Sequence, residues 1–131
     1  MRWLPVAAVL LLGAAACEDD AVAPDEESVF VIDVEGQQFR IRASGASVIA
    51  ALEARRASGE EGVILGSLVE GDGGFNQPWS WHLDPATIEV ADVAIEVCDG
   101  TPDMVEDDLN YWLDTVQTYC PWGAEVIAIE N

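Results

Sequence analysis

The sequence predicts an α+β domain with a mainly antiparallel sheet of about six strands, two helices and one disulfide. Three observations support this class. Apolar and polar residues alternate in several short stretches, two other stretches have helical spacing, and two cysteines remain once an N-terminal leader is set aside. The predicted order of elements is ββα, βββ, αβ, and runs of this kind are typical of α+β domains.

The first 16 residues have the layout of a signal peptide. Arg2 precedes an apolar run that closes in small residues, and the run is too short to be a stable transmembrane helix. Cys17 follows directly, so the junction resembles the bacterial lipoprotein processing site, where the cysteine becomes acylated. We expect an exported lipoprotein of the cell envelope, facing the periplasm or the cell surface. The alternative is an ordinary signal cut just before Cys17, which would give a secreted protein.

Residues 17–28 are acidic and poor in apolar side chains, and they predict a flexible tether. The globular domain is then expected over residues 29–131. Its first elements form a hairpin, because residues 29–34 and 38–43 both alternate with period two on either side of a glycine turn. Arg40 and Arg42 share the solvent face of the second strand, where we expect them to neutralise neighbouring acids.

A short helix is predicted next. Residues 44–47 break the strand and offer a helix cap, residues 48–56 carry an apolar stripe, and Gly59 ends the helix. Arg55 and Arg56 lie in the last turn, where the negative end of the helix dipole favours cations.

Three more strands are expected, over residues 63–69, 79–83 and 87–98. The last is the longest, and the phase of its alternation slips by one near residues 91–92. A slip of this kind predicts a β-bulge, and two strands separated by a break are the alternative. A second helix over residues 101–117 begins at a Thr-Pro pair with several acids in its first turns, and residues 124–129 form the last strand.

The cysteines predict one disulfide. If Cys17 carries lipid, Cys98 and Cys120 remain, and an oxidising compartment favours their pairing. The bridge would close a loop of about 20 residues and stabilise the domain by roughly 3 kcal/mol. Two buried free thiols are the alternative.

The charge balance excludes some classes of partner. There are 25 acids and 5 arginines, with no lysine, for a net charge of -20. Such a chain repels phosphate backbones and anionic lipid headgroups, so we expect no nucleic-acid partner and no membrane contact beyond a lipid on Cys17. The acidity reflects solubility or a saline habitat, or else attracts a basic partner or divalent cations.

No cofactor or metal site is predicted. The cysteine and histidine spacings of zinc sites are absent, and so is the EF-hand spacing. Asp99 with Asp103, and Asp107 with Asp108 and Asn110, could hold calcium, but a solvated acidic face is the favoured interpretation.

The segment 73–85 combines glycines, prolines and aromatics around the only histidine, and it predicts a recognition loop. The alternative is that Trp79 and Trp81 are core residues, because they share parity with Leu83 on a strand. We expect the three residues before Pro78 to be exposed. The candidate ligand-binding residues are Phe75, Asn76, Gln77, Trp79, Trp81 and His82.

Catalysis is the rival interpretation of the same loop. His82 could act as a general base beside a carboxylate such as Asp84, which would make the protein a hydrolase or a lyase. No nucleophile elbow or catalytic triad is present, and a lone histidine on a strand is more typical of a structural hydrogen bond. We therefore assign no catalytic residue and expect no enzyme.

Four segments carry a family resemblance. Residues 39–42, 72–89, 95–100 and 119–122 resemble small exported bacterial domains that are similar to the N-terminal domain of a slime-mould calmodulin-binding protein. The resemblance covers about residues 38–130, implies a small globular domain with Cys98 and Cys120 as partners, and supplies no catalytic set. Calmodulin takes basic amphipathic helices, so we do not expect this acidic chain to bind it.

These observations predict an exported, lipid-anchored binding or interaction module whose partner is an unknown protein or glycan. A hydrolase or lyase and a structural protein of the cell envelope are the alternatives.

Overall fold

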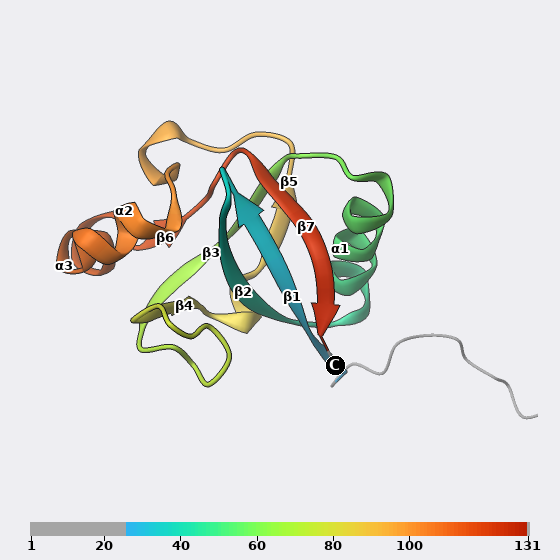
Figure 1. The fold of residues 1–131 in the computed structure, drawn as a ribbon, viewed down its shortest axis with the longest axis horizontal. Coiled ribbons are helices and arrows are strands. Elements are labelled where there is room, and N and C mark those ends of the chain that lie inside the picture. Colours follow the sequence, from blue (N-terminus) through green and yellow to red (C-terminus); the bar gives the residue numbers. More distant parts are fainter. Residues whose placement is uncertain (1–25, 131) are drawn as a thin grey trace, which may run out of the picture.

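A computed structural model describes residues 26–130, and it confirms the predicted α+β class (Figure 1). The predicted signal peptide, the lipidation site Cys17 and most of the tether lie outside the described residues. None of the helices in the described part is long and apolar enough to cross a membrane. The strands form two antiparallel sheets rather than one, with one strand more than expected.

The first sheet has the order β2-β1-β7, with β1 (Glu27–Val34) in the centre, β2 (Gln37–Ser44) on one side and β7 (Ala124–Glu130) on the other. The predicted hairpin of β1 and β2 is confirmed in full register, from Glu27 opposite Ser44 to Val34 opposite Gln37. Its turn has positive φ at Glu35 and Gly36, which is the backbone that matches the twist of a two-residue hairpin. The first strand begins two residues before the predicted start of the domain.

The second sheet is built around β3 (Val63–Glu70). Its partners are β4 (Trp81–Leu83), β5 (Glu89–Ala91) and the two-residue β6 (Thr118–Tyr119), which pair with different stretches of β3. An isolated bridge between Gly62 and Ala124 links the start of this sheet to the first one. The two sheets share one main core, and Val63, Cys98 and Cys120 form a second, smaller buried cluster.

Aliphatic and aromatic side chains both contribute to the main core. Phe30, Ile32 and Ile41 are fully buried. Tyr119 has three aromatic neighbours with ring centroids 5.4 to 5.9 Å away, namely Phe39, Trp81 and Trp112. Complete burial of each such side chain stabilises the fold by about 1.5–3 kcal/mol, and the tilted and edge-on ring pairs add to it.

Helix α1 (Ala46–Ser58) packs Ile49 and Leu52 into the core and ends at Gly59 in the left-handed conformation, as predicted. The predicted cap within residues 44–47 is confirmed: Gly45 is the N-cap residue, and no side chain accepts a hydrogen bond there. In Figure 1, α1 and the segment of α2 and α3 lie at opposite ends of the molecule.

The predicted long strand over residues 87–98 is wrong, and so is its bulge. A 3₁₀ turn, η1 (Pro85–Thr87), precedes β5, and a second one, η2 (Glu96–Cys98), follows an irregular loop. Pairing stops at Ala91 because its partner Val63 is the first residue of β3. Beyond that point the alternation buries nothing, since the exposed fractions of Val93, Ile95 and Val97 are 75%, 70% and 59%.

The predicted helix over residues 101–117 is interrupted. It consists of α2 (Pro102–Asp107), the single turn α3 (Leu109–Tyr111) and a π-helical turn, η3 (Trp112–Val116). The break occurs at Asp108, whose φ and ψ of -131° and 47° are not helical. Thr101 does occupy the N-cap position, but its hydroxyl contacts the Asp103 carboxylate instead of a backbone N–H.

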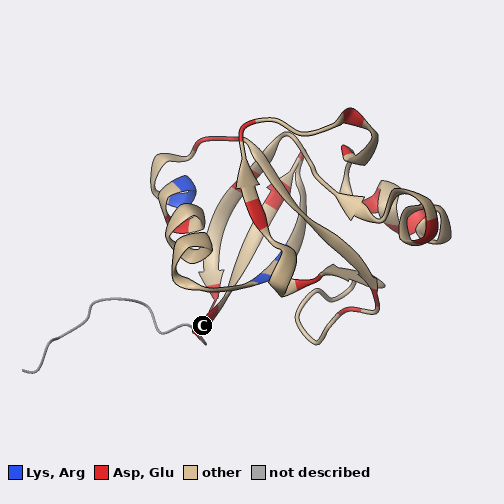
Figure 2. Cartoon of the chain, turned by 180° about the vertical axis from the view of Figure 1, so that it is seen from behind, with Lys and Arg blue, Asp and Glu red and all other residues tan. Residues whose placement is uncertain are grey.

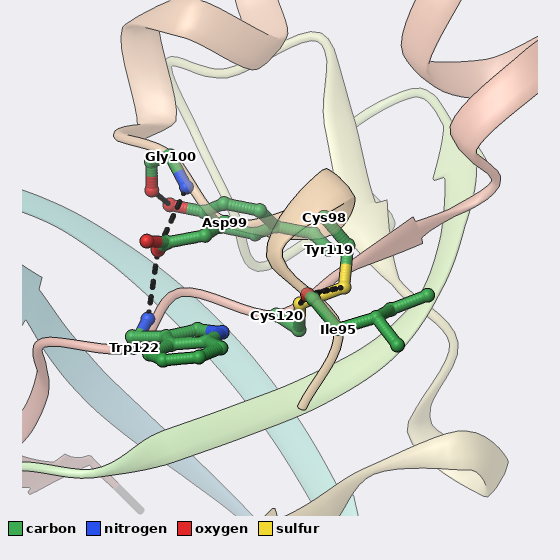
Figure 3. The surroundings of a disulfide bond; sticks show 7 residues. All are labelled: Ile95, Cys98, Asp99, Gly100, Tyr119, Cys120 and Trp122. Atoms are coloured by element: carbon green, nitrogen blue, oxygen red, sulfur yellow. Dashed lines mark hydrogen bonds between the residues drawn. A yellow bond between two sulfur atoms is a disulfide. The ribbon is translucent and has the colours of Figure 1, made fainter. Parts of the chain in front are cut away.

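The predicted disulfide between Cys98 and Cys120 is confirmed, with a sequence separation of 22 and both cysteines buried (Figure 3). The backbone N–H of Cys120 also donates to the carbonyl of Cys98 at 2.8 Å. Asp99 then accepts hydrogen bonds from the backbone N–H groups of Gly100 and Trp122. The bridge thus fastens the irregular loop after β5 to the chain between β6 and β7.

Candidate functional site

The segment of residues 71–80 joins β3 to β4, and its backbone is ordered by internal hydrogen bonds. The N–H of Gly71 donates to the carbonyl of Ser80 at 2.8 Å, which closes the base of the loop. The Asp72 carboxylate accepts from the N–H of Gly74 at 2.8 Å, and this bond, with a further one from Gln77, lowers the pKa of Asp72. The loop is therefore preorganised.

Asn76 was predicted to be exposed, but it is fully buried, with an exposed fraction of 0%. Its Oδ1 accepts a hydrogen bond from the backbone N–H of Arg40 at 2.7 Å, and its Nδ2 donates to the carbonyl of Trp81 at 2.7 Å. The side chain therefore joins the free edge of β2 to the start of β4. Its burial follows from that bridging position, which no local pattern in the loop could reveal.

The two tryptophans lie in different environments. Trp81 is fully buried against Phe39 and Tyr119, so the alternative that it is a core residue is confirmed. Its indole N–H has no hydrogen-bond partner among the described residues. Trp79 is half-buried, and its Nε1 donates to the carbonyl of Gln38 at 2.8 Å. Together with Asn76, Trp79 occupies the edge of β2 that pairs with no strand among residues 26–130.

His82 has a structural partner. Its Nδ1 lies 2.7 Å from the carbonyl oxygen of Gly71, and its ring meets Phe75 edge-on at 5.5 Å. The Asp84 carboxylate accepts from the backbone N–H of Ala86, which caps η1. Within residues 26–130 no hydrogen bond joins His82 to Asp84.

The remaining loop residues border an open groove. It has a volume of about 520 Å³ and lies between the outer face of the first sheet and the loop. Val29 lines the groove from β1, Arg40 and Arg42 line it from β2, and Glu130 lines it from β7. The loop contributes Gly74, Phe75 and Gln77.

The two arginines of the groove are held differently. Arg40 makes a bidentate ion pair with Glu130 through Nε and Nη2, at 2.9 to 3.1 Å. This pair raises the pKa of Arg40 and lowers the pKa of Glu130, because the hydrogen bonds favour both charged forms. The guanidinium of Arg42 instead lies 4.7 Å from the centroid of the Phe75 ring, and its Nε is 3.8 Å from a carboxylate oxygen of Glu27.

Cations are scarce elsewhere on the domain. No Lys or Arg follows Arg56 in the sequence. Figure 2 shows basic residues only on α1 and near β2, whereas α2 and its surroundings carry acids alone. The groove is therefore one of two places in residues 26–130 where the domain presents positive charge. Period-two alternation placed Arg40 and Arg42 on one face, but only the tertiary structure brings the loop over them.

The acids proposed as possible calcium ligands do not converge. No group of three His, Cys, Asp or Glu side chains that could hold a metal ion occurs between residues 26 and 130. Asp99 caps backbone N–H groups, and Asp103 bonds to Thr101 and to Gln37.

The fold and groove define a small disulfide-bonded α+β domain with a preorganised loop beside an arginine pair. The chain belongs to the family of the N-terminal domain of calmodulin-binding protein 74, whose model matches residues 26–131. The resemblance drawn from the sequence is thereby confirmed. Neither a curated protein nor a solved structure matches the chain. The matched range coincides with the described unit, so residues 26–131 are the domain to use in the experiments below.

Proposed function

We propose that this protein is a binding module, held at the cell envelope by a lipid on Cys17, that receives its partner in the groove between β2 and the loop of residues 71–80. The observation that carries the proposal is the combination of Arg42 and Phe75 at the groove. A cation is rare on this surface, and an aromatic ring beside it provides contact area.

Preorganisation supports a role in recognition. The base of the loop is closed by backbone hydrogen bonds, and Asn76 ties its middle to β2. Groups at the groove therefore lose little conformational freedom when a partner binds, which lowers the entropic cost of binding. Among the candidate residues, Phe75 and Gln77 are the ones that line the groove, whereas Asn76 and Trp81 are fully buried.

The position of the groove suits a short anchor. Cys17 precedes Glu27, the first residue of β1, by ten residues, and an extended chain of that length spans at most about 35 Å. A lipid on Cys17 would hold the groove close to the membrane surface, because Val29 at the start of β1 lines it. The disulfide is consistent with an exported protein.

Calmodulin is not the partner that we propose. Calmodulin takes basic amphipathic helices, and the segment after Arg56 contains neither lysine nor arginine. A hydrolase or lyase built on His82 is the second candidate. The Gly71 carbonyl holds one of its ring nitrogens, which favours a positioning role for the ring beside Phe75.

The test is affinity capture from envelope and culture extracts with residues 26–131 as bait. The variant Arg42→Gln/Phe75→Ala removes one charge and one ring from the groove. The control Arg56→Gln/Tyr111→Ala removes the same kinds of group from exposed sites on α1 and α3. We expect a partner that the parent and the control retain and the groove variant loses, with equal melting temperatures. Equal capture by all three proteins would contradict the groove as the site.

The anchor has its own test. The full chain and a Cys17→Ser variant would be produced in a bacterial host with a radiolabelled or clickable fatty acid. We expect label and membrane association for the parent and neither for the variant. Release of both proteins into the soluble fraction without label would establish the secreted alternative.

A further inference from the structure

The groove constrains the chemistry of its ligand. Resting on the function proposed above, we infer that it receives the C-terminal carboxylate of a peptide chain whose net charge is zero or positive, with Arg42 as the group that binds the carboxylate.

Arg42 is the arginine available for this role. In Arg40, Nε and Nη2 already donate to Glu130, in three contacts of 2.9 to 3.1 Å. Among residues 26–130 the terminal nitrogens of Arg42 donate no hydrogen bond, and its nearest acid, Glu27, is 3.8 Å from Nε. A planar guanidinium can donate two parallel hydrogen bonds to one carboxylate, and that of Arg42 lies 4.7 Å from the centroid of the Phe75 ring.

The charge of the protein restricts what carries that carboxylate. A net charge of -20 repels polyanions, and Glu27 and Glu130 lie beside the two arginines. Phosphates with two charges and acidic glycans with repeated charges are therefore disfavoured. A single carboxylate at the end of a neutral or basic chain satisfies Arg42, while the body of that chain is not repelled.

The remaining lining fits the end of a peptide. Val29 and Phe75 offer apolar contact to a terminal side chain, and the exposed amide of Gln77 can bond to peptide groups. The volume of about 520 Å³ lies within the range of sites that bind small ligands. Glu130, which lines the groove, is then placed to attract basic residues that precede the terminus.

The test uses two hexapeptide libraries of the form acetyl-Lys-Lys-Gly followed by three mixed positions. One library ends in a free carboxylate and the other in a carboxamide. Residues 26–131 would be immobilised, and bound peptides would be identified by mass spectrometry. The tightest free-acid peptide would then be measured by calorimetry beside its own amide.

We expect the free acid to bind at least tenfold more tightly than its amide, and Arg42→Gln to reduce this ratio to about one. Glu27→Gln removes a competitor for Arg42 and should tighten the free acid, whereas Arg56→Gln should leave the ratio unchanged. Equal binding of acid and amide, an unchanged ratio in Arg42→Gln, or no peptide retained from the free-acid library would overturn the inference.

Failure of the inference is distinguishable from failure of the proposed function. If the capture experiment still loses a partner in the groove variant while acid and amide bind alike, the groove is a recognition site for other chemistry. An oligogalacturonate added to the same calorimetric series tests the glycan directly. If the oligogalacturonate binds through Arg42 and the free-acid peptides do not bind, the ligand is an acidic sugar and not a peptide C-terminus.

Discussion

Replacing Asn76 by alanine measures how far the recognition loop depends on one buried amide. The side chain is fully buried and makes two hydrogen bonds of 2.7 Å, one to the N–H of Arg40 and one to the carbonyl of Trp81. Alanine removes both bonds at once and puts no polar atom in their place. The backbone groups on β2 and β4 then remain without their hydrogen bonds.

The size of the loss follows from these two groups. A buried group left unsatisfied costs about 1–3 kcal/mol. The cost for the Trp81 carbonyl should lie in the middle of that range, because Trp81 is fully buried. The cost for the Arg40 N–H should lie near the lower end, because Arg40 is half-buried. We expect Asn76→Ala to lower the free energy of unfolding by about 2–4 kcal/mol, a large share of the roughly 5–15 kcal/mol typical of a domain.

The assay is urea unfolding of residues 26–131, followed by tryptophan fluorescence with the disulfide intact. With a denaturant dependence of about 1.5 kcal/mol/M, the midpoint should fall by roughly 1.3–2.7 M. Gln77→Ala is the neighbouring control, since Gln77 is exposed, and it should change stability by about 0.5 kcal/mol or less. A loss below about 1 kcal/mol for Asn76→Ala would refute the reasoning.

Asn76→Asp tests the direction of each hydrogen bond. The variant keeps an acceptor for Arg40 but places a carboxylate oxygen against the Trp81 carbonyl, where only the protonated acid can donate. Burial and this contact should raise the pKa of the new carboxyl above its unfolded value. Its stability should therefore be highest at low pH and fall as pH rises above about 4. A pH dependence equal to that of the parent would show that the donor and acceptor assignment is wrong.

Three further outcomes are expected. Cys98→Ala/Cys120→Ala should lower the free energy of unfolding by about 3 kcal/mol in urea, because the bridge joins cysteines 22 residues apart, and an unchanged midpoint would contradict this. Glu130→Gln should lower the free energy of unfolding at neutral pH and progressively less in acid. The pKa of Glu130 lies below its ordinary 4.5, so the ion pair with Arg40 is lost as pH falls through that lowered value. A stability difference that persisted at about pH 2 would exclude the ion pair as its cause. Burial raises the pKa of Tyr119 above its ordinary 10.0, so the folded protein keeps the phenol proton while the unfolded protein loses it, and the stability of the parent should fall above about pH 10. Tyr119→Phe should remove this alkaline loss but lower the free energy of unfolding by about 1 kcal/mol at neutral pH, because the hydrogen bond to the Gly100 carbonyl is lost. Urea titrations at neutral and alkaline pH would show both effects.

The elements that the sequence predicted well are those whose partners are close in the chain. The hairpin of β1 and β2 needs only alternation and a turn with Gly36 at positive φ. Helix α1 needs an apolar stripe and the left-handed Gly59. The disulfide needs only the number of cysteines and their expected compartment.

The errors occurred where the outcome depended on a distant partner. Alternation at Val93, Ile95 and Val97 predicted a strand, but β3 provides no residue to pair with them and they remain exposed. The same limit affected the helix over residues 101–117, which breaks at Asp108. The local sequence pattern indicates which element a segment can form, but whether the element forms depends on contacts with distant segments.

The sequence by itself determined the class of fold, the family, the disulfide and the placement of two arginines on one strand face. Only the tertiary structure decided the site. It buried Asn76, left Phe75 half-buried rather than exposed as predicted, and left Gln77 exposed. It also brought a loop that follows β2 by some 30 residues across Arg40 and Arg42. The physical reason is that a strand edge must satisfy its backbone hydrogen bonds. Which side chain does so is set by packing across the whole chain rather than by neighbours in sequence.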